Sequence, residues 1–589
     1  MVSLPHSVAD TALARLFTGD RASAETRLFS LPGGQHLFEA GEVADELYFL
    51  RAGRLGAVKR AEGEEPRFLG VIRPGEPAGE MAIIAGQPHS ATVVALRDSE
   101  IIALPATAFF AAVEHDPMVM IELSRLMIRR ARSGAERAPV GEPSVFGVIG
   151  IVEGEPVREF CERLSDAIEA TGFTAVVVGY EALSAPTEWF STVEADHDFV
   201  IYAAEYDDLS WRQLVGRQVD RLFLLARGRH APPARTEPYS SDALTRQGLV
   251  DLILIQDPDL VRPTGSEAWL DATKVTRLFH IRQGDAADVA RLARIVSGQS
   301  VGLVLSGGGA RAYAHVGAVK ALREQGVPID FVGGSSMGAI VAAGIGCAWD
   351  DAELAQRITA AFVESSPLDD ITLPLIAMTR GDKVRQRLHE HFGDVEIADL
   401  WLPFFCISSN LTSGAYQLHR RGSLRHALRA SISLPGVMPP VCQDNNILVD
   451  GAVMKNFPSD VMRAFHLGPI VGVDVTRGRS ITANDVRTES VWRWILSGDW
   501  RRGPPIVSLL MRAATVSSGR DMAAAREATD LLITPAVEGV EIRNWRAFEP
   551  AVESGYRTAL AALAKLTKPV TSLRRRLSLA DQAKLAAPR

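Results

Sequence analysis

The stretch VGLVLSGGGARAYAHVGAVKALREQGVPIDFVGGSSMGAI, residues 301–340, contains two glycine-rich turns. Each turn follows an apolar, strand-like run and precedes a run with helical periodicity, which predicts two consecutive strand–turn–helix units. The first turn is Gly-Gly-Gly-Ala-Arg, 307–311, and the second is Gly-Gly-Ser-Ser-Met-Gly, 333–338. Backbone N–H groups at such turns suit either the phosphates of a nucleotide or the oxyanion of an acyl transfer.

The first turn matches a dinucleotide-binding motif poorly. The motif GxGxxG ends on a glycine, whereas the corresponding position here is Ala312. A dinucleotide site also requires an acid at the end of the next strand, to bind a ribose. Here Asp330 precedes that strand, and the strand ends in Gly-Gly-Ser-Ser. The dinucleotide interpretation is therefore disfavoured.

The second turn matches the GxSxG pattern of a nucleophile elbow, with Gly334, Ser336 and Gly338 at the defining positions. Glycines two residues before and after the serine leave room for a strained turn that projects its hydroxyl group. Taken alone, the pattern also occurs by chance, with the serine serving as a helix N-cap. The strand–turn–helix context favours the nucleophile, and the N–H groups of Gly308 and Gly309 are candidates to stabilise the oxyanion.

A serine nucleophile needs a base, and Asp450 is the strongest candidate. It lies at a strand end in NNILVDGAVMKNFP, although a turn aspartate is the alternative. His466 is the one histidine after Asp450, and it precedes a predicted helix end at Gly468. His315 and His419 lie in patterned segments that indicate structural roles.

Taken together, the GGGxR loop, GxSxG and Asp-Gly-Ala resemble the patatin-like phospholipase family, over about 301–475. The resemblance implies a Ser–Asp dyad without histidine, in which Ser336 is the nucleophile and Asp450 the base. It also implies the other site residues, which are the oxyanion residues Gly307, Gly308, Gly309 and Arg311 and the motif residues Gly334, Gly338, Gly451 and Ala452. A solvated arginine is the alternative for Arg311, and Ala312 departs from the glycine usual at its position.

Residues 280–317 resemble the neuropathy target esterase branch of this family, whose members join cyclic-nucleotide-binding-like domains to a patatin domain. Residues 27–105 agree, because short alternating strands with Gly and Pro punctuation predict a β-barrel or jelly roll. The resemblance implies a phosphate cassette made of Gly79, Glu80, Met81, Ala82, His89 and Ser90. In that cassette a glutamate binds the ribose and an arginine binds the cyclic phosphate. His89 replaces the arginine, so we expect cyclic nucleotides to bind weakly or not at all.

The whole chain is predicted to be a multidomain protein. The expected parts are a cyclic-nucleotide-binding-like barrel with helices at 10–132, a middle α/β domain at 145–297, an α/β patatin-like hydrolase core at 300–475, and a C-terminal extension with a basic tail at 476–589. In the middle domain, apolar runs alternate with helical patterns, as in a parallel sheet. The turn at 153–156 has no GxxxxGK[ST], so this domain is expected to lack a phosphate loop.

Composition limits the partners. The chain has 589 residues, a net charge of −8 and four widely spaced cysteines. Nucleic acid is therefore disfavoured, and the cysteines indicate a reducing compartment. No metal-ligand pattern and no cofactor motif is visible. With no secretory signal and no apolar run of ~18 residues, we expect a cytoplasmic protein. Peripheral contact with the inner membrane surface is a further hypothesis, based on residues 491–512 and the basic cluster 574–576.

The favoured function is a serine esterase that hydrolyses an acyl ester of a phospholipid or lysophospholipid through an acyl-enzyme. This substrate class is implied by the family resemblance. The alternative is a cyclic-nucleotide-responsive regulatory protein with a vestigial hydrolase domain. A nucleotide-dependent function of the middle domain is a third hypothesis, disfavoured by the missing phosphate loop.

Overall fold

The structure is a computed structural model of the 589-residue chain. The residues that it describes are 17, 26–59, 67–135, 144–233, 250–275, 277–365, 370–373, 376–466, 468–476, 519–537, 540 and 544–574. The chain divides into two compact units. The first unit consists of Met1–Leu254, Ala272–Arg277 and Leu577–Arg589. The second unit consists of Ile255–Asp271 and Leu278–Arg576. Each unit is described by itself.

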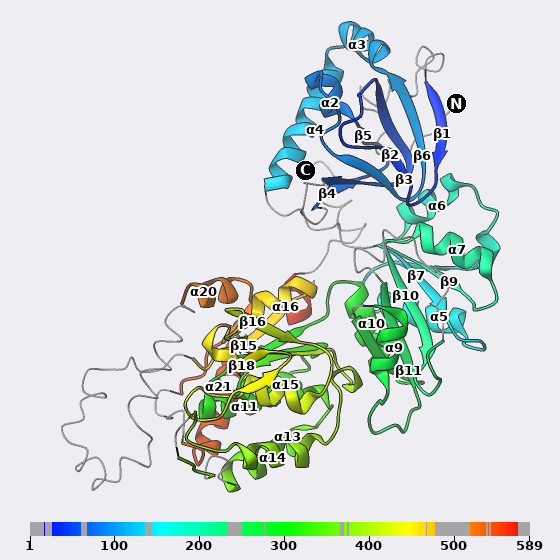
Figure 1. Cartoon of the computed structure of the whole chain (residues 1–589). Coiled ribbons are helices and arrows are strands. Elements are labelled where there is room, and N and C mark those ends of the chain that lie inside the picture. Colours follow the sequence, from blue (N-terminus) through cyan, green and yellow to red (C-terminus); the bar gives the residue numbers. More distant parts are fainter. Residues whose placement is uncertain are drawn as a thin grey trace. The chain divides into compact units, whose positions relative to one another are not determined.

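The amino-terminal region is an antiparallel barrel with helices, as predicted (Figure 1). Its strands are β1 (Arg27–Leu31), β2 (His36–Phe38), β3 (Glu46–Lys59), β4 (Arg67–Ile72), β5 (Pro77–Ala78) and β6 (Thr92–Pro105), and its helices are α2 (Glu80–Ala85), α3 (Ala106–His115) and α4 (Met118–Ala135). The long strands β3 and β6 alternate buried and partly exposed side chains, because one face covers the apolar core. Residues 106–132 do not form one continuous helix. The structure has two helices instead, because Pro117 interrupts the helical hydrogen bonds.

The middle region is built on a sheet of order β12-β11-β10-β7-β9-β8. Its strands are β7 (Val145–Gly150), β8 (Ala175–Val178), β9 (Phe199–Ala204), β10 (Arg221–Arg227), β11 (Val250–Gln256) and β12 (Arg277–Arg282), and its helices are α5 (Val157–Glu169), η2 (Tyr180–Ala182), α6 (Thr187–Asp196), α7 (Leu209–Gln218), α9 (Ser266–Thr273) and α10 (Ala286–Val296). The pairs β10–β7, β7–β9 and β8–β9 are parallel, which agrees with the predicted alternation. Asp285 caps α10 by accepting the N–H groups of Ala287 and Asp288.

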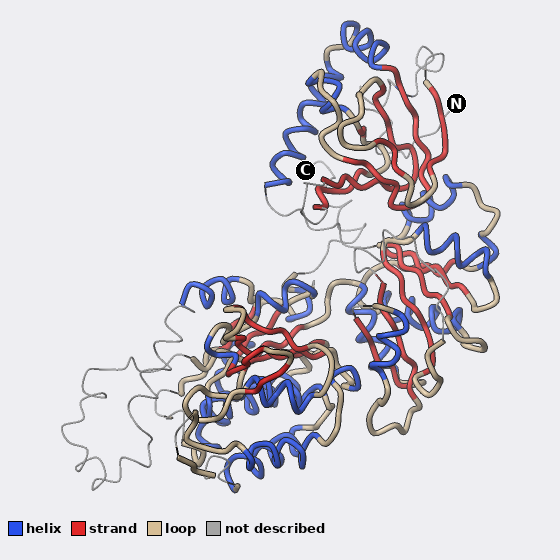
Figure 2. The backbone as a smooth tube through the Cα atoms, in the orientation of Figure 1, coloured by secondary structure: helices blue, strands red, loops and turns tan. Residues whose placement is uncertain are grey.

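The carboxy-terminal region is an eight-stranded sheet of order β17-β18-β15-β14-β13-β19-β20, with β16 paired to β15. Its strands are β13 (Gly302–Leu305), β14 (Phe331–Ser335), β15 (Phe404–Asn410), β16 (Ala415–His419), β17 (Val441–Gln443), β18 (Asn446–Asp450), β19 (Ile470–Val473) and β20 (Leu531–Ile533). The central strands are buried on both faces, and Figure 2 shows helices on both sides of this sheet.

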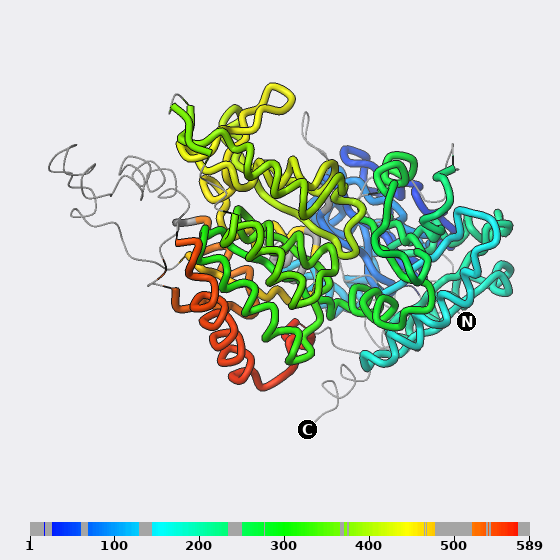
Figure 3. The backbone as a smooth tube through the Cα atoms, turned by 90° about the horizontal axis from the view of Figure 1, so that it is seen from below, coloured from blue at the N-terminus to red at the C-terminus, as the bar shows by residue number. Residues whose placement is uncertain are grey.

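The helices of this region follow the expected strand–helix alternation. They are η3 (Gly309–Tyr313), α11 (Ala314–Glu324), α12 (Met337–Gly346), α13 (Asp351–Ile358), the π-helix η4 (Thr359–Glu364), α14 (Asp382–Phe392), η5 (Ile397–Asp399), α15 (Leu424–Ser431), η6 (Gly451–Val453), α16 (Ser459–Phe465), α20 (Gly519–Glu527), α21 (Phe548–Leu563) and η8 (Val570–Ser572). Figure 3 shows α21 alongside α11. Gly317 and Gly555 permit this close packing, since a Cβ at either residue would overlap the backbone of the other helix. No helix in the part of the chain that the structure describes is long and apolar enough to span a bilayer.

Candidate active site

The turn between β14 and α12 has the geometry of a nucleophile elbow. Ser336 has φ 53° and ψ −132°, a backbone conformation that L-residues rarely adopt. The flanking glycines are required because a Cβ atom at either position would overlap the backbone of the preceding strand. A Cβ at Gly334 would lie 2.7 Å from the carbonyl oxygen of Leu305, and a Cβ at Gly338 would lie 2.5 Å from that of Ser306. The end of β13 therefore packs directly against the elbow, and the strain at Ser336 is maintained by its surroundings.

The strands β14 and β18 meet end to end along β15. β15 pairs with β16 through residues 406–410, which occupies one of its two edges. β14 pairs with residues 404–407 and β18 with residues 408–410, so both must lie on the other edge. Because β14 is parallel to β15 and β18 is antiparallel to it, their carboxyl ends face each other. Ser335 pairs with Ile407 and Asp450 with Ser408, so the two predicted catalytic residues lie at this junction.

The junction places Ser336 and Asp450 in direct contact. The Oγ of Ser336 donates a 2.7 Å hydrogen bond to Oδ2 of Asp450. Ser336 is 8% exposed and Asp450 is 1% exposed. Ser336 is therefore slightly more exposed than Asp450, whose carboxyl group is covered by protein.

Burial changes the acidity of Asp450. It raises the pKa of the carboxyl group to about 6, although hydrogen bonds from the Ala452 N–H and the Ser336 hydroxyl oppose the shift. Oδ1 accepts the Ala452 N–H at 2.8 Å, which fixes the carboxyl plane and leaves Oδ2 for the serine. The group is thus ionised at neutral pH, yet it is a stronger base than an ordinary aspartate.

Ser335, the neighbouring serine in the motif, is fully buried. Its Oγ has no hydrogen-bond partner among the described residues. A Cβ at Gly451 would overlap this Oγ and the Ile407 carbonyl group, which explains the glycine after Asp450. The geometry thus distinguishes the two serines, and Ser336 is the accessible one.

Two further serines support the pair, and the sequence analysis did not identify them. The Ser336 N–H donates to Oγ of Ser431 at 3.0 Å, and Ser431 donates to the Ile407 carbonyl at 2.6 Å. The Asp450 N–H donates to the Ser433 carbonyl at 2.9 Å. Both serines lie in RASISLPG, where no motif distinguishes them from other helix-terminal serines.

The first glycine turn lies against the elbow. A Cβ at Gly307 would come within 2.9 Å of Cβ of Ser336 and 2.5 Å of Oδ1 of Asn456. The Gly307 N–H donates to the Asn456 carbonyl at 3.2 Å, which fixes the loop. Asn456 was also missed, because it lies six residues after Asp450 and outside the Asp-Gly-Ala motif.

Gly308 is the N-cap residue of η3 and Gly309 is its first residue, where the N–H groups have no partner within the helix. Gly309 has φ 57°, a value that favours glycine. Arg311 donates from Nε to the Val540 carbonyl at 2.7 Å, so it contacts protein rather than being only solvated.

The histidines near the sheet make structural contacts. The rings of His315 and His466 are buried and bond to the carbonyl groups of Ser306 and Pro469, at 2.8 and 3.1 Å. His419 contacts Oγ of Ser408 at 2.7 Å. Burial lowers the pKa of His315 and His419 to about 4. Ser336 bonds to Asp450 rather than to any of these rings.

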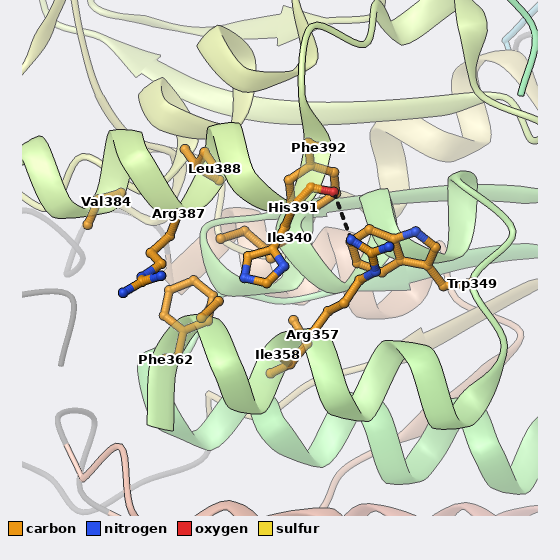
Figure 4. A pocket seen from close by; sticks show the side chains of 11 residues that line it. Ile340, Trp349, Arg357, Ile358, Phe362, Val384, Arg387, Leu388, His391 and Phe392 are labelled. Carbon is orange, nitrogen blue, oxygen red and sulfur yellow. Dashed lines mark hydrogen bonds between the residues drawn. The ribbon is translucent and has the colours of Figure 1, made fainter. Parts of the chain in front are cut away.

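An apolar pocket lies among the helices that follow the elbow. Figure 4 shows its side chains, which include Ile340 of α12, Trp349, Phe362 of the π-helix, and Phe392. Arg357 stacks over Trp349 and donates to the His391 carbonyl at 3.3 Å. The guanidinium group of Arg357 thus contacts the protein at the edge of the pocket.

In the other unit, the histidine of the predicted phosphate cassette is packed inside the protein. The His89 ring is buried and stacks on Phe38, with centroids 3.6 Å apart. It lies so close to Gly79 that a Cβ there would be 3.2 Å from Cε1 of His89. Burial lowers the pKa of His89, so the ring is neutral at pH 7. Glu80 is buried at the start of α2.

The structure describes the remaining cassette residues, but only part of the segments on which the membrane hypothesis is based. Ala82 is buried, whereas Met81 and Ser90 are exposed. Residues 491–512, 575 and 576 lie outside the described residues. Arg574 forms an ion pair with Asp530 at 2.6 Å. No cluster of metal-ligating side chains occurs among the described residues.

Comparisons with known proteins agree with this arrangement. A family model for patatin-like phospholipase matches residues 303–463, and one for the cyclic nucleotide-binding domain matches residues 28–116. An uncharacterized NTE family protein of Mycobacterium tuberculosis is 32% identical over 578 residues, covering 94% of each chain. The neuropathy target esterase of Drosophila melanogaster is 28% identical over 597 residues, covering 89% of this chain and 42% of that protein. A lysophospholipase of Aspergillus fumigatus is 26% identical over 640 residues, covering 90% and 41%.

Proposed function

This chain belongs to the NTE family of patatin-like lipid ester hydrolases, and from that premise we propose that Ser336 is its nucleophile and Asp450 its general base. The observation that carries the proposal is the 2.7 Å hydrogen bond from the Ser336 hydroxyl to a buried carboxylate. The strained elbow and the adjoining glycine loop support the same assignment.

In the first half of the reaction, Oγ of Ser336 attacks the ester carbonyl carbon while Oδ2 of Asp450 accepts its proton. The carbonyl oxygen becomes an oxyanion, which the N–H groups of Gly308 and Gly309 stabilise. When the tetrahedral intermediate collapses, the carbon–oxygen bond to the alcohol breaks. The protonated Asp450 returns its proton to the leaving alkoxide, and an acyl-serine remains.

In the second half, water takes the place of the alcohol. Asp450 accepts a proton from the water as its oxygen attacks the acyl-serine, and the same oxyanion site is used again. Collapse breaks the bond to Oγ, Asp450 returns the proton to Ser336, and a fatty acid is released. A carboxylate with a pKa near 6 suits this role, because it is ionised at pH 7 and basic enough to accept a proton.

We propose a phospholipid or lysophospholipid as substrate, on the basis of the patatin-like phospholipase match and the lysophospholipase relative. A regulatory protein with a vestigial hydrolase is less well supported. The Ser336–Asp450 bond is intact, and His89, which stands where the cassette would have an arginine for the cyclic phosphate, is stacked on Phe38.

Labelling with a serine-directed fluorophosphonate tests the nucleophile. We expect the parent to be labelled at Ser336 and Ser336→Ala to lose labelling and all hydrolysis of a soluble nitrophenyl ester. Ser335→Ala is the matched control, since its Oγ is buried and does not contact Asp450. It should keep at least about a third of the parent activity, because it removes no group of the proposed reaction. Loss of labelling in Ser335→Ala with retention in Ser336→Ala would refute the assignment.

A further inference from the structure

A short hairpin in the hydrolase unit exposes three large aliphatic side chains. We call residues 370–373 and 376–380 the apolar hairpin. Ile371 bridges to Thr379, and the Thr372 N–H donates to the Met378 carbonyl at 2.9 Å. Ile371, Leu373 and Ile376 are 63%, 75% and 74% exposed.

Such a group is unusual on a protein surface. Single exposed aliphatic residues are common, but a cluster of them marks a surface that contacts another apolar phase. The two described arms of the apolar hairpin, 370–373 and 376–380, are hydrogen-bonded to each other and carry its three exposed residues. Its exposure is therefore built into the fold.

The base of the hairpin is attached to the segment that supports the proposed catalytic residues. The Met378 N–H donates to the Gly436 carbonyl and the Thr379 N–H to the Val437 carbonyl, both at 3.0 Å. Ser433, shortly before these residues, accepts the Asp450 N–H. The base of the hairpin is thus hydrogen-bonded to the same segment, 433–437, that contacts Asp450.

Charge around the hairpin favours an anionic surface. Arg380 ends the hairpin and Lys383 is the second residue of α14, and both are exposed. Two nearby carboxylates have partners on the protein. Asp370 accepts the N–H groups of Asp382 and Lys383, at 2.7 and 3.3 Å, and Asp382 forms an ion pair with Arg385.

A second exposed apolar group lies where β15 extends past the end of β14. Leu411 follows β15, Tyr416 lies in β16 and Ile447 in β18, and they are 50%, 45% and 42% exposed. β15 runs parallel to β14, so this group lies toward the same carboxyl end of the sheet as the elbow. The hydrolase unit thus has a second group of exposed apolar side chains, at the carboxyl end of its sheet.

We propose that the apolar hairpin inserts into the surface of an anionic lipid bilayer and delivers the active site to its substrate. The reason for delivery rests on the proposed function, whereas the binding itself does not depend on it. Aliphatic side chains enter the acyl boundary, and Arg380 and Lys383 contact the anionic head groups. Among possible occupants, a lipid surface matches both the three exposed aliphatic side chains and the adjoining cations.

The test uses the full chain and vesicles of phosphatidylcholine with 30% phosphatidylglycerol, ~100 nm across, a probe that carries the anionic surface charge. The variant Ile371→Ser/Leu373→Ser/Ile376→Ser should bind these vesicles at least about tenfold more weakly in sedimentation, because it removes the buried apolar area. Val261→Ser is the matched control, because Val261 is 89% exposed in the same unit but lies outside the hairpin. It should bind as the parent does.

Charge and catalysis are measured separately. Arg380→Gln/Lys383→Gln should weaken binding by about tenfold or more on the anionic vesicles, and by less than about twofold on pure phosphatidylcholine. The serine triple variant should lose vesicle phospholipid hydrolysis in proportion to binding. It should hydrolyse a soluble nitrophenyl ester within about twofold of the parent, since no proposed catalytic group is changed.

A spectroscopic variant reports insertion without removing apolar area. Leu373→Trp should shift its fluorescence to shorter wavelength when the anionic vesicles are added, because the indole enters the acyl boundary. An unshifted spectrum, or unchanged vesicle binding by the serine triple variant, would overturn the proposal. Parent dimerisation that the triple variant abolishes, together with unchanged vesicle binding, would assign the hairpin to self-association instead. If Ser336 failed the labelling test, vesicle binding would still decide this proposal independently.

Discussion

At the scale of single residues, the burial of Asp450 predicts how hydrolysis depends on pH. The raised pKa of about 6 means that the carboxyl group is protonated, and inactive as a base, at pH 5. We expect kcat/KM for a soluble ester to rise tenfold per pH unit below about 6 and to level off above about 7. His466→Ala should leave the profile unchanged, because that ring contacts a backbone carbonyl group. A profile that shifts in His466→Ala would mean that a histidine is the base.

The burial of Asp450 also predicts that stability falls as the pH rises, whereas activity rises. Asp450 binds a proton more tightly in the folded protein than in the unfolded chain, since burial raises its pKa from 3.8 to about 6. Its contribution to the free energy of unfolding is therefore fully present below pH 3.8 and is lost as the pH rises through 6. At about 1.4 kcal/mol for each pKa unit, the loss at pH 8 is about 3 kcal/mol.

Asp450→Asn has no charge to bury, so it should unfold at a higher temperature than the parent at pH 8 while being inactive. The difference in thermal midpoint between variant and parent should shrink toward pH 4, where both side chains are neutral. Ser336→Ala, measured beside it, retains the carboxylate and should show no such gain. An Asp450→Asn variant that is equally destabilised at both pH values would contradict the effect of burial.

Residue identities were predictable from the sequence where chemistry requires a fixed motif. Ser336 and Asp450 were predicted from GxSxG and Asp-Gly-Ala, and the structure brings the two side chains together. Ser431, Ser433 and Asn456 were not predictable, because their contributions depend on backbone groups that meet only in the folded sheet. A hydroxyl or carbonyl group at a helix end leaves no distinct pattern in one sequence.

At the scale of elements, helix α12 packs on the end of β13 through one glycine. A methyl group at Gly338 would overlap the carbonyl groups of Leu305 and Ser306, which are backbone and cannot rotate away. We expect Gly338→Ala to lower the free energy of unfolding by about 1–3 kcal/mol, as overpacking does, and to lower kcat/KM by displacing the elbow.

Gly346→Ala is the control on the same helix, and thermal midpoint and kcat/KM are measured for both variants. Its Cβ would lie 3.3 Å from a side-chain atom, Cδ1 of Leu400, which can move. The gain in helix propensity, up to about 1 kcal/mol, offsets this mild crowding, so the variant should be close to neutral. Equal losses in both variants would contradict the importance of the contact with β13.

Most strands and helices were predictable, because period-2 and period-3.6 patterns are local. In the middle sheet, the predicted alternation of apolar runs with helical patterns agrees with the parallel pairing of β7, β8, β9 and β10, whereas β12 was not predicted. Pro117 separates α3 from α4, because proline has no N–H group to continue a helix. The junction of β14 with β18 was not predictable, since strand pairing at long sequence separation is not encoded in local periodicity.

At the scale of the whole molecule, the barrel should respond little to cyclic nucleotides. The neutral His89 ring stacked on Phe38 replaces a cation, and the loss of a charged hydrogen bond costs about 1.5–3 kcal/mol. His89→Arg should therefore tighten cyclic AMP binding by the full chain by about 10- to 100-fold, as measured by calorimetry at pH 8. Tight binding by the unaltered chain at pH 8 would contradict this account.

The fold class of each region was predictable, because the apolar periodicity and the motifs change along the chain. The barrel and the patatin-like hydrolase are both matched by family models. The boundaries 10–132, 145–297, 300–475 and 476–589 remain predictions. Local sequence patterns do not predict contacts between elements that are distant in sequence. One such contact is the ion pair of Arg97 with Glu194, at 2.6 Å, which joins β6 to α6 within one unit.

The end-to-end meeting of β14 and β18 has a consequence for protein synthesis. Ser336 and Asp450 are 114 residues apart and are aligned by the pairing of both strands with β15. A chain still growing on the ribosome has the serine elbow long before it has the base. If the proposed dyad is correct, such a chain cannot cleave lipid until β18 has been made and has closed this long loop. Hydrolysis would then begin only after β18 has paired with β15, so the nascent chain cannot attack membranes before that point.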